Sequence, residues 1–143
     1  MDKGYSGARH RGLVRLLDAN FNRSREGLRV CEDICRFVAE DKQLTSELKS
    51  IRHGITRALK SMEGVPFLES RDVLNDGGKG FSKLERKRSG WKDLYFANLE
   101  RSKESLRVLE EGVKLLEKPD QARVFKKLRF KLYALEKKSL GKL

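Results

Sequence analysis

Apolar residues recur at helical spacing in four stretches of the chain. Three of them run from about residue 11 to 39, from about 45 to 62 and from about 92 to 117, with apolar positions three or four residues apart. The fourth follows Pro119, where Asp120 is expected to cap the start of a helix. The β-branched and aromatic clusters that are typical of strands are scarce. The pattern therefore predicts an all-α fold.

The sequence contains an internal repeat. Residues 19–38 and 97–116, at an offset of 78, are identical at nine of twenty positions, roughly an order of magnitude above chance. A fainter match at an offset of 77 relates residues 49–55 to residues 126–132. Each repeated unit is therefore predicted to be a hairpin of two helices, and the two hairpins are expected to pack as a four-helix bundle.

The length of the chain, 143 residues, is usual for one domain. We expect a single domain over residues 1–143, with repeat one at about 11–62, a long Gly-rich and basic loop at about 63–91, and repeat two at about 92–140. No run of about 18 apolar residues occurs, and the first residues lack the apolar stretch of a signal peptide. We therefore expect a cytoplasmic protein with no membrane partner.

Polar residues fall inside the apolar arc of the first helix of each repeat. When the helices are projected at about 100° per residue, the positions concerned are Asn20, Arg23 and Gly27 and their repeat equivalents Asn98, Arg101 and Ser105. Burying a guanidinium or an amide costs several kcal/mol unless partners satisfy it. Ordinary core packing therefore does not explain these residues, which occur in duplicate.

Two compatible interpretations account for these polar residues. In the first, Glu26 and Glu104, three residues after Arg23 and Arg101, form an internal ion-pair network that locks the two hairpins together. In the second, the two helices enclose a polar pocket in which the Arg and Asn side chains face a ligand phosphate or ring.

Two further features of the repeated helices concern packing. Cys31 and Cys35 lie four residues apart among apolar residues, without the spacing of a zinc site, and are expected to be buried free thiols. A surface ion-pair ladder is expected on the outer face, from Arg29, Glu32 and Asp33 in the first repeat and Arg107, Glu110 and Glu111 in the second.

The loop between the repeats, EGVPFLESRDVLNDGGKGFSKLERKRSG at residues 63–90, is long for a compact domain. Its segment 76–80 could turn backbone N–H groups toward a phosphate, with Lys79 as a cationic contact. Arg71 could pair with a phosphate, and Asp72 and Asp76 offer the oxygen ligands that Mg²⁺ prefers. Simple turn chemistry is an equally simple explanation of the same residues.

The formal net charge of +12 predicts an anionic partner. RNA, DNA, an acidic membrane surface and phosphorylated metabolites all satisfy that condition. Aromatic residues that would stack on single-stranded bases are few, which favours a small phosphorylated ligand over nucleic acid.

Five segments give the chain a family resemblance that covers nearly its whole length. They are LLDANFNRSREGLRVCEDICRF at 16–37, LKSIRH at 48–53, SRDVLNDGG at 70–78, ANLERSKESLRVLEEGVKL at 97–115 and LRFKLYALE at 128–136. With these segments the chain resembles the monofunctional hydroxymethylpyrimidine phosphate kinases, a domain often fused in front of thiamine phosphate synthase. It departs from the family's RDxxxDVGT pattern by placing Gly77 and Lys79 where Val and Thr are common.

The resemblance implies transfer of the γ-phosphoryl group of ATP onto hydroxymethylpyrimidine monophosphate, with Mg²⁺, giving the diphosphate used to make thiamine phosphate. Such a transfer needs positive charge and alignment rather than a base, because the acceptor oxygen is already anionic. Arg23, Arg101, Asp72 and Asp76 are the expected catalytic residues. Arg23, Arg101 and Lys79 would neutralise phosphate, Asp72 and Asp76 would hold Mg²⁺, Asn20 and Asn98 would orient the substrate, and Glu26, Glu104, Arg71 and Gly78 would add substrate contacts.

Other functions stay open at this point. The chain could bind a ligand of thiamine metabolism without turnover, as a regulatory module, or it could be a basic helical binder of nucleic acid. Association with thiamine phosphate synthase and the oligomeric state are also open.

Overall fold

The computed structural model describes residues 7–62, 64–80 and 87–143. Its elements are α1 (Gly7–Phe37), α2 (Lys42–Lys60), α3 (Phe67–Ser70), α5 (Trp91–Gly112), the 3₁₀ turn η1 (Val113–Leu116) and α6 (Pro119–Ser139). Over these ranges there is no strand, so the predicted all-α fold is confirmed. Nor does any helix in them combine the length and apolar character needed to cross a bilayer.

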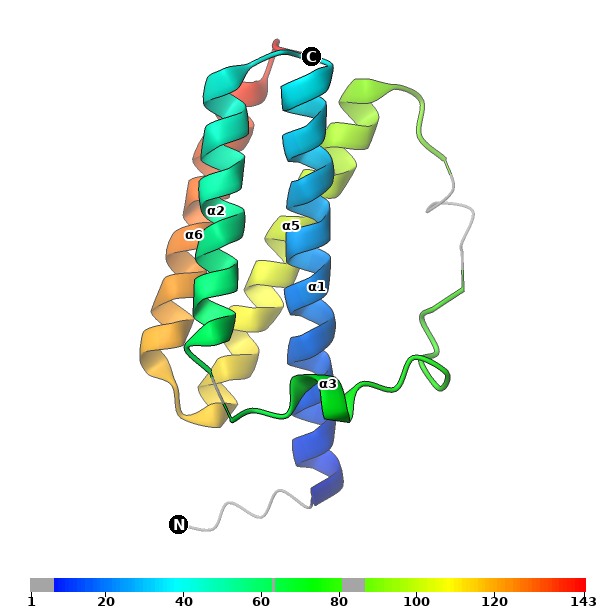
Figure 1. The fold of residues 1–143 in the computed structure, drawn as a ribbon, viewed down its shortest axis with the longest axis vertical. Coiled ribbons are helices and arrows are strands. Elements are labelled where there is room, and N and C mark those ends of the chain that lie inside the picture. The colour runs from blue at the N-terminus through cyan, green and yellow to red at the C-terminus, as the bar shows by residue number, and fades with distance from the viewer. Residues whose placement is uncertain (1–6, 63, 81–86) are drawn as a thin grey trace.

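The four long helices form two antiparallel hairpins, α1–α2 and α5–α6, which pack against each other as a bundle (Figure 1). α1 packs along α5 and α2 packs along α6, so equivalent helices of the two repeats contact each other. α1 and α5 run in opposite directions, as a pseudo-twofold axis across the bundle requires (Figure 1). The predicted four-helix bundle of duplicated hairpins is confirmed.

The helix ends differ from the predicted ends by a few residues. α2 begins at Lys42, earlier than expected, because Asp41 caps it and its Oδ1 accepts the N–H of Leu44 at 2.9 Å. α5 ends at Gly112, and its continuation tightens into η1 before Glu117, in a left-handed conformation, stops the turn. The loop after α2 also contains α3, a single helical turn that lies against α1.

One hydrophobic core runs through all four long helices. Phe21 of α1 packs edge to face on Phe125 of α6, with ring centroids 5.6 Å apart. The buried hydroxyl of Tyr95 shares a hydrogen bond with Ser139 at 2.6 Å, so this polar group is satisfied inside the core. The core therefore ties each helix of one repeat to the other repeat.

Cys31 and Cys35 are buried free thiols, as predicted. The Cys31 thiol donates a hydrogen bond to the backbone oxygen of Tyr95 at 3.3 Å. Burial raises the pKa of both thiols, so they stay protonated and act as packing groups.

In each hairpin a buried glutamate of the first helix forms an ion pair with an arginine of the second helix. Arg52 of α2 contacts Glu32 of α1 at 2.8 Å, and Arg129 of α6 contacts Glu110 of α5 at 3.0 Å. The prediction that Glu32 and Glu110 lie on the outer face was wrong, because α2 and α6 cover this side of α1 and α5 and supply the arginines. The exposed part of the expected ladder is confirmed, with ion pairs Arg29–Asp33 at 3.7 Å and Arg107–Glu111 at 3.5 Å.

α1 and α5 approach each other closely at Gly27. A Cβ atom built on Gly27 would overlap the Ser102 Oγ and lie 2.8 Å from the backbone oxygen of Asn98. The Ser102 hydroxyl donates to the backbone oxygen of Ser24 at 3.1 Å, which joins the two helices at the same level. A side chain larger than hydrogen at residue 27 would therefore push α5 away from α1.

Candidate active site

A cavity of about 520 Å³ opens between α1 and α5, and we call it the axial groove. Its ten lining residues form five pairs related by the repeat offset of 78. The pairs are Asn20 with Asn98, Arg23 with Arg101, Glu26 with Glu104, Gly27 with Ser105, and Val30 with Val108. Because every lining residue has its equivalent in the lining, the groove lies on the pseudo-twofold axis between the two repeats.

The two asparagines, one toward each end of the groove, are held in the same way. Nδ2 of Asn20 donates to the backbone oxygen of Leu16 at 2.8 Å, and Nδ2 of Asn98 donates to that of Leu94 at 2.8 Å. Asn20 is buried and Asn98 is half-buried. Each amide is fixed by its nitrogen, which leaves its oxygen as an acceptor for a ligand.

The two arginines of the groove are exposed, so the prediction that they are buried was wrong. The cause is that α2 and α6 pack on the other side of α1 and α5, so this stretch of the apolar arc faces solvent. Neither Arg23 nor Arg101 forms an ion pair within residues 7–62, 64–80 and 87–143. The expected network with Glu26 and Glu104 is therefore not formed there, and both guanidinium groups remain available to a ligand.

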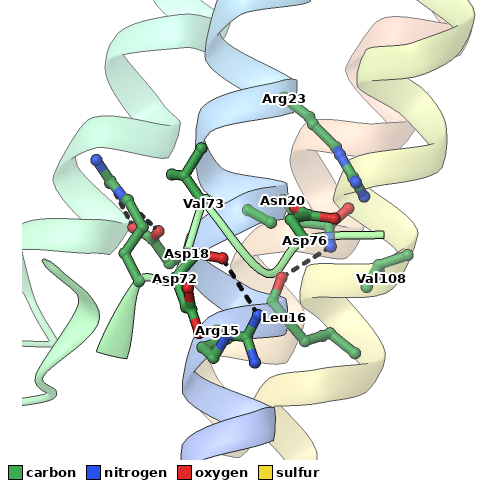
Figure 2. Close-up of a pocket in the computed structure, with 11 residues that line it drawn as sticks. Arg15, Leu16, Asp18, Asn20, Arg23, Asp72, Val73, Asp76 and Val108 are labelled. Carbon is green, nitrogen blue, oxygen red and sulfur yellow. Dashed lines mark hydrogen bonds and ion pairs between the residues drawn. The ribbon is translucent and has the colours of Figure 1, made fainter. Parts of the chain in front are cut away.

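A second cavity of about 410 Å³ adjoins the axial groove and lies between α1 and the loop after α3; we call it the loop cavity (Figure 2). It shares Asn20, Arg23 and Val108 with the axial groove. Asp72 and Asp76 line it from the loop side. The structure thus brings these two predicted metal ligands to the same cavity as Asn20 and Arg23, on one side of the pseudo-twofold axis.

An ion pair between Arg71 and Asp18 fastens this loop to α1. The guanidinium donates from Nε and Nη2 to the two carboxylate oxygens of Asp18, both at 2.8 Å. Hydrogen bonding to Asp18 raises the pKa of Arg71. Arg71 is therefore held by a protein carboxylate, and its place in the site is to position the loop.

Sequence reasoning missed Asp18. The repeat equivalent of Asp18 is Phe96, so the comparison of the two repeats, which singled out Asn20 and Arg23, passed over it. Its place inside the matched segment at 16–37, next to those residues, was the signal that could have found it. Asp18 and the loop that it holds break the symmetry of the groove, because residue 96 carries no charge with which to hold a loop.

Asp72 and Asp76 also stabilise turns of the loop. The Asp72 carboxylate accepts hydrogen bonds from the side chain of Asn75 at 2.9 and 3.1 Å and from its N–H at 3.3 Å, and these bonds keep the pKa of Asp72 below its usual value. Oδ1 of Asp76 accepts the N–H of Gly78 at 2.8 Å. Oδ2 of Asp76 has no such partner among the described residues, so Asp76 keeps a free oxygen.

Gly78 and Lys79 do not line either cavity. The N–H of Gly78 is used by Asp76, and Nζ of Lys79 donates to the backbone oxygen of Leu74 at 2.8 Å. These contacts are the turn chemistry that was the alternative for segment 76–80. The structure therefore does not bring these two residues to the other predicted site residues.

The carboxylates of the loop cavity are the candidate ligands of the expected Mg²⁺. Among the described residues, no group of three or more His, Cys, Asp or Glu side chains could enclose a metal ion. Mg²⁺ at phosphoryl-transfer sites is commonly held by one or two carboxylates, with water and substrate phosphates as its other ligands. Asp72 and Asp76 fit that donor set. Among the described residues, side chains alone would not complete the coordination of the ion.

Comparison with known proteins gives a family and a set of relatives. The model of the ThiD2 family matches residues 15–138. The chain is 42% identical over 130 residues to a thiamine-phosphate synthase of Synechocystis sp., and 39% identical over 134 residues to one of Nostoc sp.. It is 34% identical over 128 residues to the thiamine-phosphate synthase of Rhodopirellula baltica.

The relatives are much longer than this chain. The three alignments cover 90%, 90% and 89% of this chain but 36%, 36% and 34% of the relatives. The chain therefore spans about a third of the length of the curated relatives that it matches. No solved structure matches it.

Proposed function

The chain belongs to the ThiD2 family, and on this premise we propose that it is an ATP-dependent kinase of thiamine biosynthesis, which converts hydroxymethylpyrimidine monophosphate to the diphosphate. The observation that carries the proposal is a pair of guanidinium groups, Arg23 and Arg101, that have no ion pair within the part of the chain that the structure describes. They lie in a groove that adjoins a second cavity lined by two aspartates. The relatives carry the name thiamine-phosphate synthase, which supports the assignment of the chain to thiamine biosynthesis.

The proposed reaction is a direct phosphoryl transfer. An oxygen of the acceptor monophosphate attacks the γ-phosphorus of ATP, the bond from that phosphorus to the β,γ-bridging oxygen breaks, and ADP leaves with its electrons. The new P–O bond completes the diphosphate. The attacking oxygen is already ionised, so the protein needs to supply charge and alignment and no base. The two cavities suit this need, because both are lined by arginine side chains.

The roles of the residues follow from their positions. Arg23 and Arg101 neutralise phosphate, since their donors have no partner among the described residues. Asn20 and Asn98 present fixed amide oxygens that accept hydrogen bonds from an aminopyrimidine, and Glu26 and Glu104 add acceptors on the axial groove. Asp72 and Asp76 are the carboxylates that would hold Mg²⁺, which would supply positive charge to offset that of the phosphates. Arg71 positions the loop through Asp18, and Lys79 and Gly78 support its turn.

The test is an assay of ADP release with hydroxymethylpyrimidine monophosphate, ATP and Mg²⁺, together with detection of the pyrimidine diphosphate. The proposal expects both products in equal amounts. Tight binding of the monophosphate without ADP release would instead support a regulatory module without turnover. Binding of nucleic acid that falls steeply with salt and is insensitive to Asn20→Ala would support the nucleic-acid alternative.

We further propose that the diphosphate passes to a thiamine-phosphate synthase, as the names of the relatives suggest. Co-elution of the chain with that enzyme in gel filtration would support a physical complex. Separate elution at micromolar concentrations would leave transfer by free diffusion.

A further inference from the structure

A third cavity continues the row of cavities along α1. It measures about 490 Å³, lies between the first turns of α1 and the segment 69–72, and we call it the α1-start cavity. It shares Arg15, Arg71 and Asp72 with the loop cavity, which in turn shares Asn20 and Arg23 with the axial groove. The three cavities are therefore neighbours in a row along α1, with the loop cavity in the middle.

The two ends of this row differ. The axial groove is lined by five pairs of repeat-related residues, which include carboxylates, amides and guanidinium groups. The α1-start cavity is lined by Arg11, Gly12 and Arg15 of α1 and has no equivalent in the second repeat, where residue 93, the equivalent of Arg15, is aspartate. Arg15, which this cavity shares with the loop cavity, suits a ligand with several phosphates.

The position of the aspartates fixes the order of the substrates. Asp72 and Asp76 line the middle cavity, and in a phosphoryl transfer the metal lies with the phosphates between the donor and the acceptor. With the pyrimidine in the axial groove, the reacting phosphates therefore lie in the loop cavity. The rest of the donor must extend into the remaining end, the α1-start cavity.

We propose that a nucleoside triphosphate binds along the first half of α1, with its nucleoside in the α1-start cavity and its phosphates beside Arg15, while the acceptor lies in the axial groove. This inference rests on the proposed function. Arg15 is exposed, and its one hydrogen bond within the described residues, from Nη2 to the backbone oxygen of Asp72 at 3.4 Å, leaves most of its donors free.

The proposed order of the substrates gives Arg23 and Arg101 different roles. The loop cavity is lined by Arg23 and not by Arg101. A monophosphate in the axial groove can meet the donor only with its phosphate at the Arg23 end. Arg23 therefore contacts the reacting phosphate, and Arg101 binds the acceptor away from the transfer.

The test is calorimetric binding of two ligands measured separately: the Mg²⁺ complex of the β,γ-imido analogue of ATP, and hydroxymethylpyrimidine monophosphate. Arg15→Met should weaken binding of the nucleotide about tenfold or more and leave binding of the monophosphate within about twofold. Arg101→Met should do the reverse. Arg57→Met, an exposed arginine of α2 that lines none of these cavities, is the matched control and should change neither affinity.

A second variant tests the location by bulk instead of charge. A Cβ atom on Gly12 meets nothing within 4 Å, so Gly12→Ala should leave nucleotide binding unchanged, whereas Gly12→Leu projects into the α1-start cavity and should weaken it. Both changes favour the helix, so a loss of folding does not explain the difference. Circular dichroism and a thermal melt check this for each variant.

The outcomes separate this inference from the kinase proposal. If the wild-type protein binds both ligands and the variants divide as expected, but no ADP is released, the kinase proposal fails and the substrate order stands. If Arg15→Met and Gly12→Leu leave nucleotide binding unchanged, or if Arg101→Met weakens it as strongly as binding of the monophosphate, the order is overturned. Absence of any nucleotide binding by the wild-type protein also overturns it.

Discussion

The interior of each hairpin and the groove between the hairpins both contain charged residues that are repeated in the two halves, but these charges are paired in one region and unpaired among the described residues in the other. Inside the hairpins, Glu32 and Glu110 are buried and each is paired with an arginine from the neighbouring helix. In the axial groove, Arg23 and Arg101 are exposed and have no ion pair among the described residues. A repeated polar residue therefore has a structural explanation where a neighbouring helix supplies its partner. Where no helix does so, the residue is available to bind a ligand.

The largest expected effect is on the buried pair of the second hairpin. Arg129→Met leaves Glu110 buried without its partner and should lower the free energy of unfolding by about 3–5 kcal/mol. Arg52→Met should cost less, because Glu32 keeps a second contact with Arg29 at 3.4 Å. Urea unfolding followed by circular dichroism measures both. Equal and small losses, below about 1 kcal/mol, would show that these pairs do not hold the hairpins together.

The next effect is on activity and separates the groove from the hairpin interior. Arg23→Met should lower kcat by about 100-fold or more, because it removes a charge at the reacting phosphate, while the urea midpoint stays at the wild-type value. Arg101→Met should act mainly on the KM of the pyrimidine monophosphate. If either variant loses stability in proportion to activity, its arginine belongs with the structural pairs instead.

A smaller effect is expected where the two helices touch beneath the groove. Gly27→Ala introduces a Cβ atom against Ser102 and the backbone of Asn98 and should destabilise the fold by about 1–3 kcal/mol, less the gain in helix propensity. The matched control, Gly12→Ala, meets open space and should stabilise the fold by up to about 1 kcal/mol. A thermal melt compares them. A neutral Gly27→Ala variant would mean that α1 and α5 separate easily.

The smallest effect concerns pH. The Asn75 hydrogen bonds lower the pKa of Asp72 in the folded protein. The stabilisation that ionised Asp72 gives the fold is therefore complete above the pKa of an unfolded aspartate, about 3.8, and is lost as the pH falls through the lower pKa of the folded state. Asp72 therefore does not titrate near neutrality. The rate should instead fall below about pH 6, where the phosphate of the acceptor gains a proton and changes from the dianion to the monoanion. If the fall of the rate at low pH moves to a different pH in the Asn75→Ala variant, protonation of Asp72 is its cause instead.

The repeat made most of the fold predictable from the sequence. The helical periodicity and the match of 19–38 to 97–116 predicted four helices in two hairpins. Three of the five residue pairs of the axial groove are the predicted interruptions of the apolar arc, namely Asn20 with Asn98, Arg23 with Arg101 and Gly27 with Ser105. Burial was harder to predict. Periodicity gives the face on which a residue lies but not which faces other helices cover, so Glu32 and Glu110 were placed outside and Arg23 and Arg101 inside.

The asymmetric part of the site could not be predicted in the same way. The Arg71–Asp18 pair spans 53 residues and follows from no repeat or helical spacing. The Gly-rich segment 76–80 suggested a phosphate loop, yet its N–H and ammonium groups are used by Asp76 and by the backbone of Leu74. Such long-range pairs and turn contacts depend on where the loop packs, which local sequence does not specify.

The most direct test of the account is a crystal structure with hydroxymethylpyrimidine monophosphate and the Mg²⁺ complex of the imido analogue of ATP. We expect the pyrimidine between Asn20 and Asn98, its phosphate beside Arg23, and the triphosphate in the loop cavity next to Asp76. An axial groove without ligand, with both ligands bound elsewhere on the bundle, would contradict it.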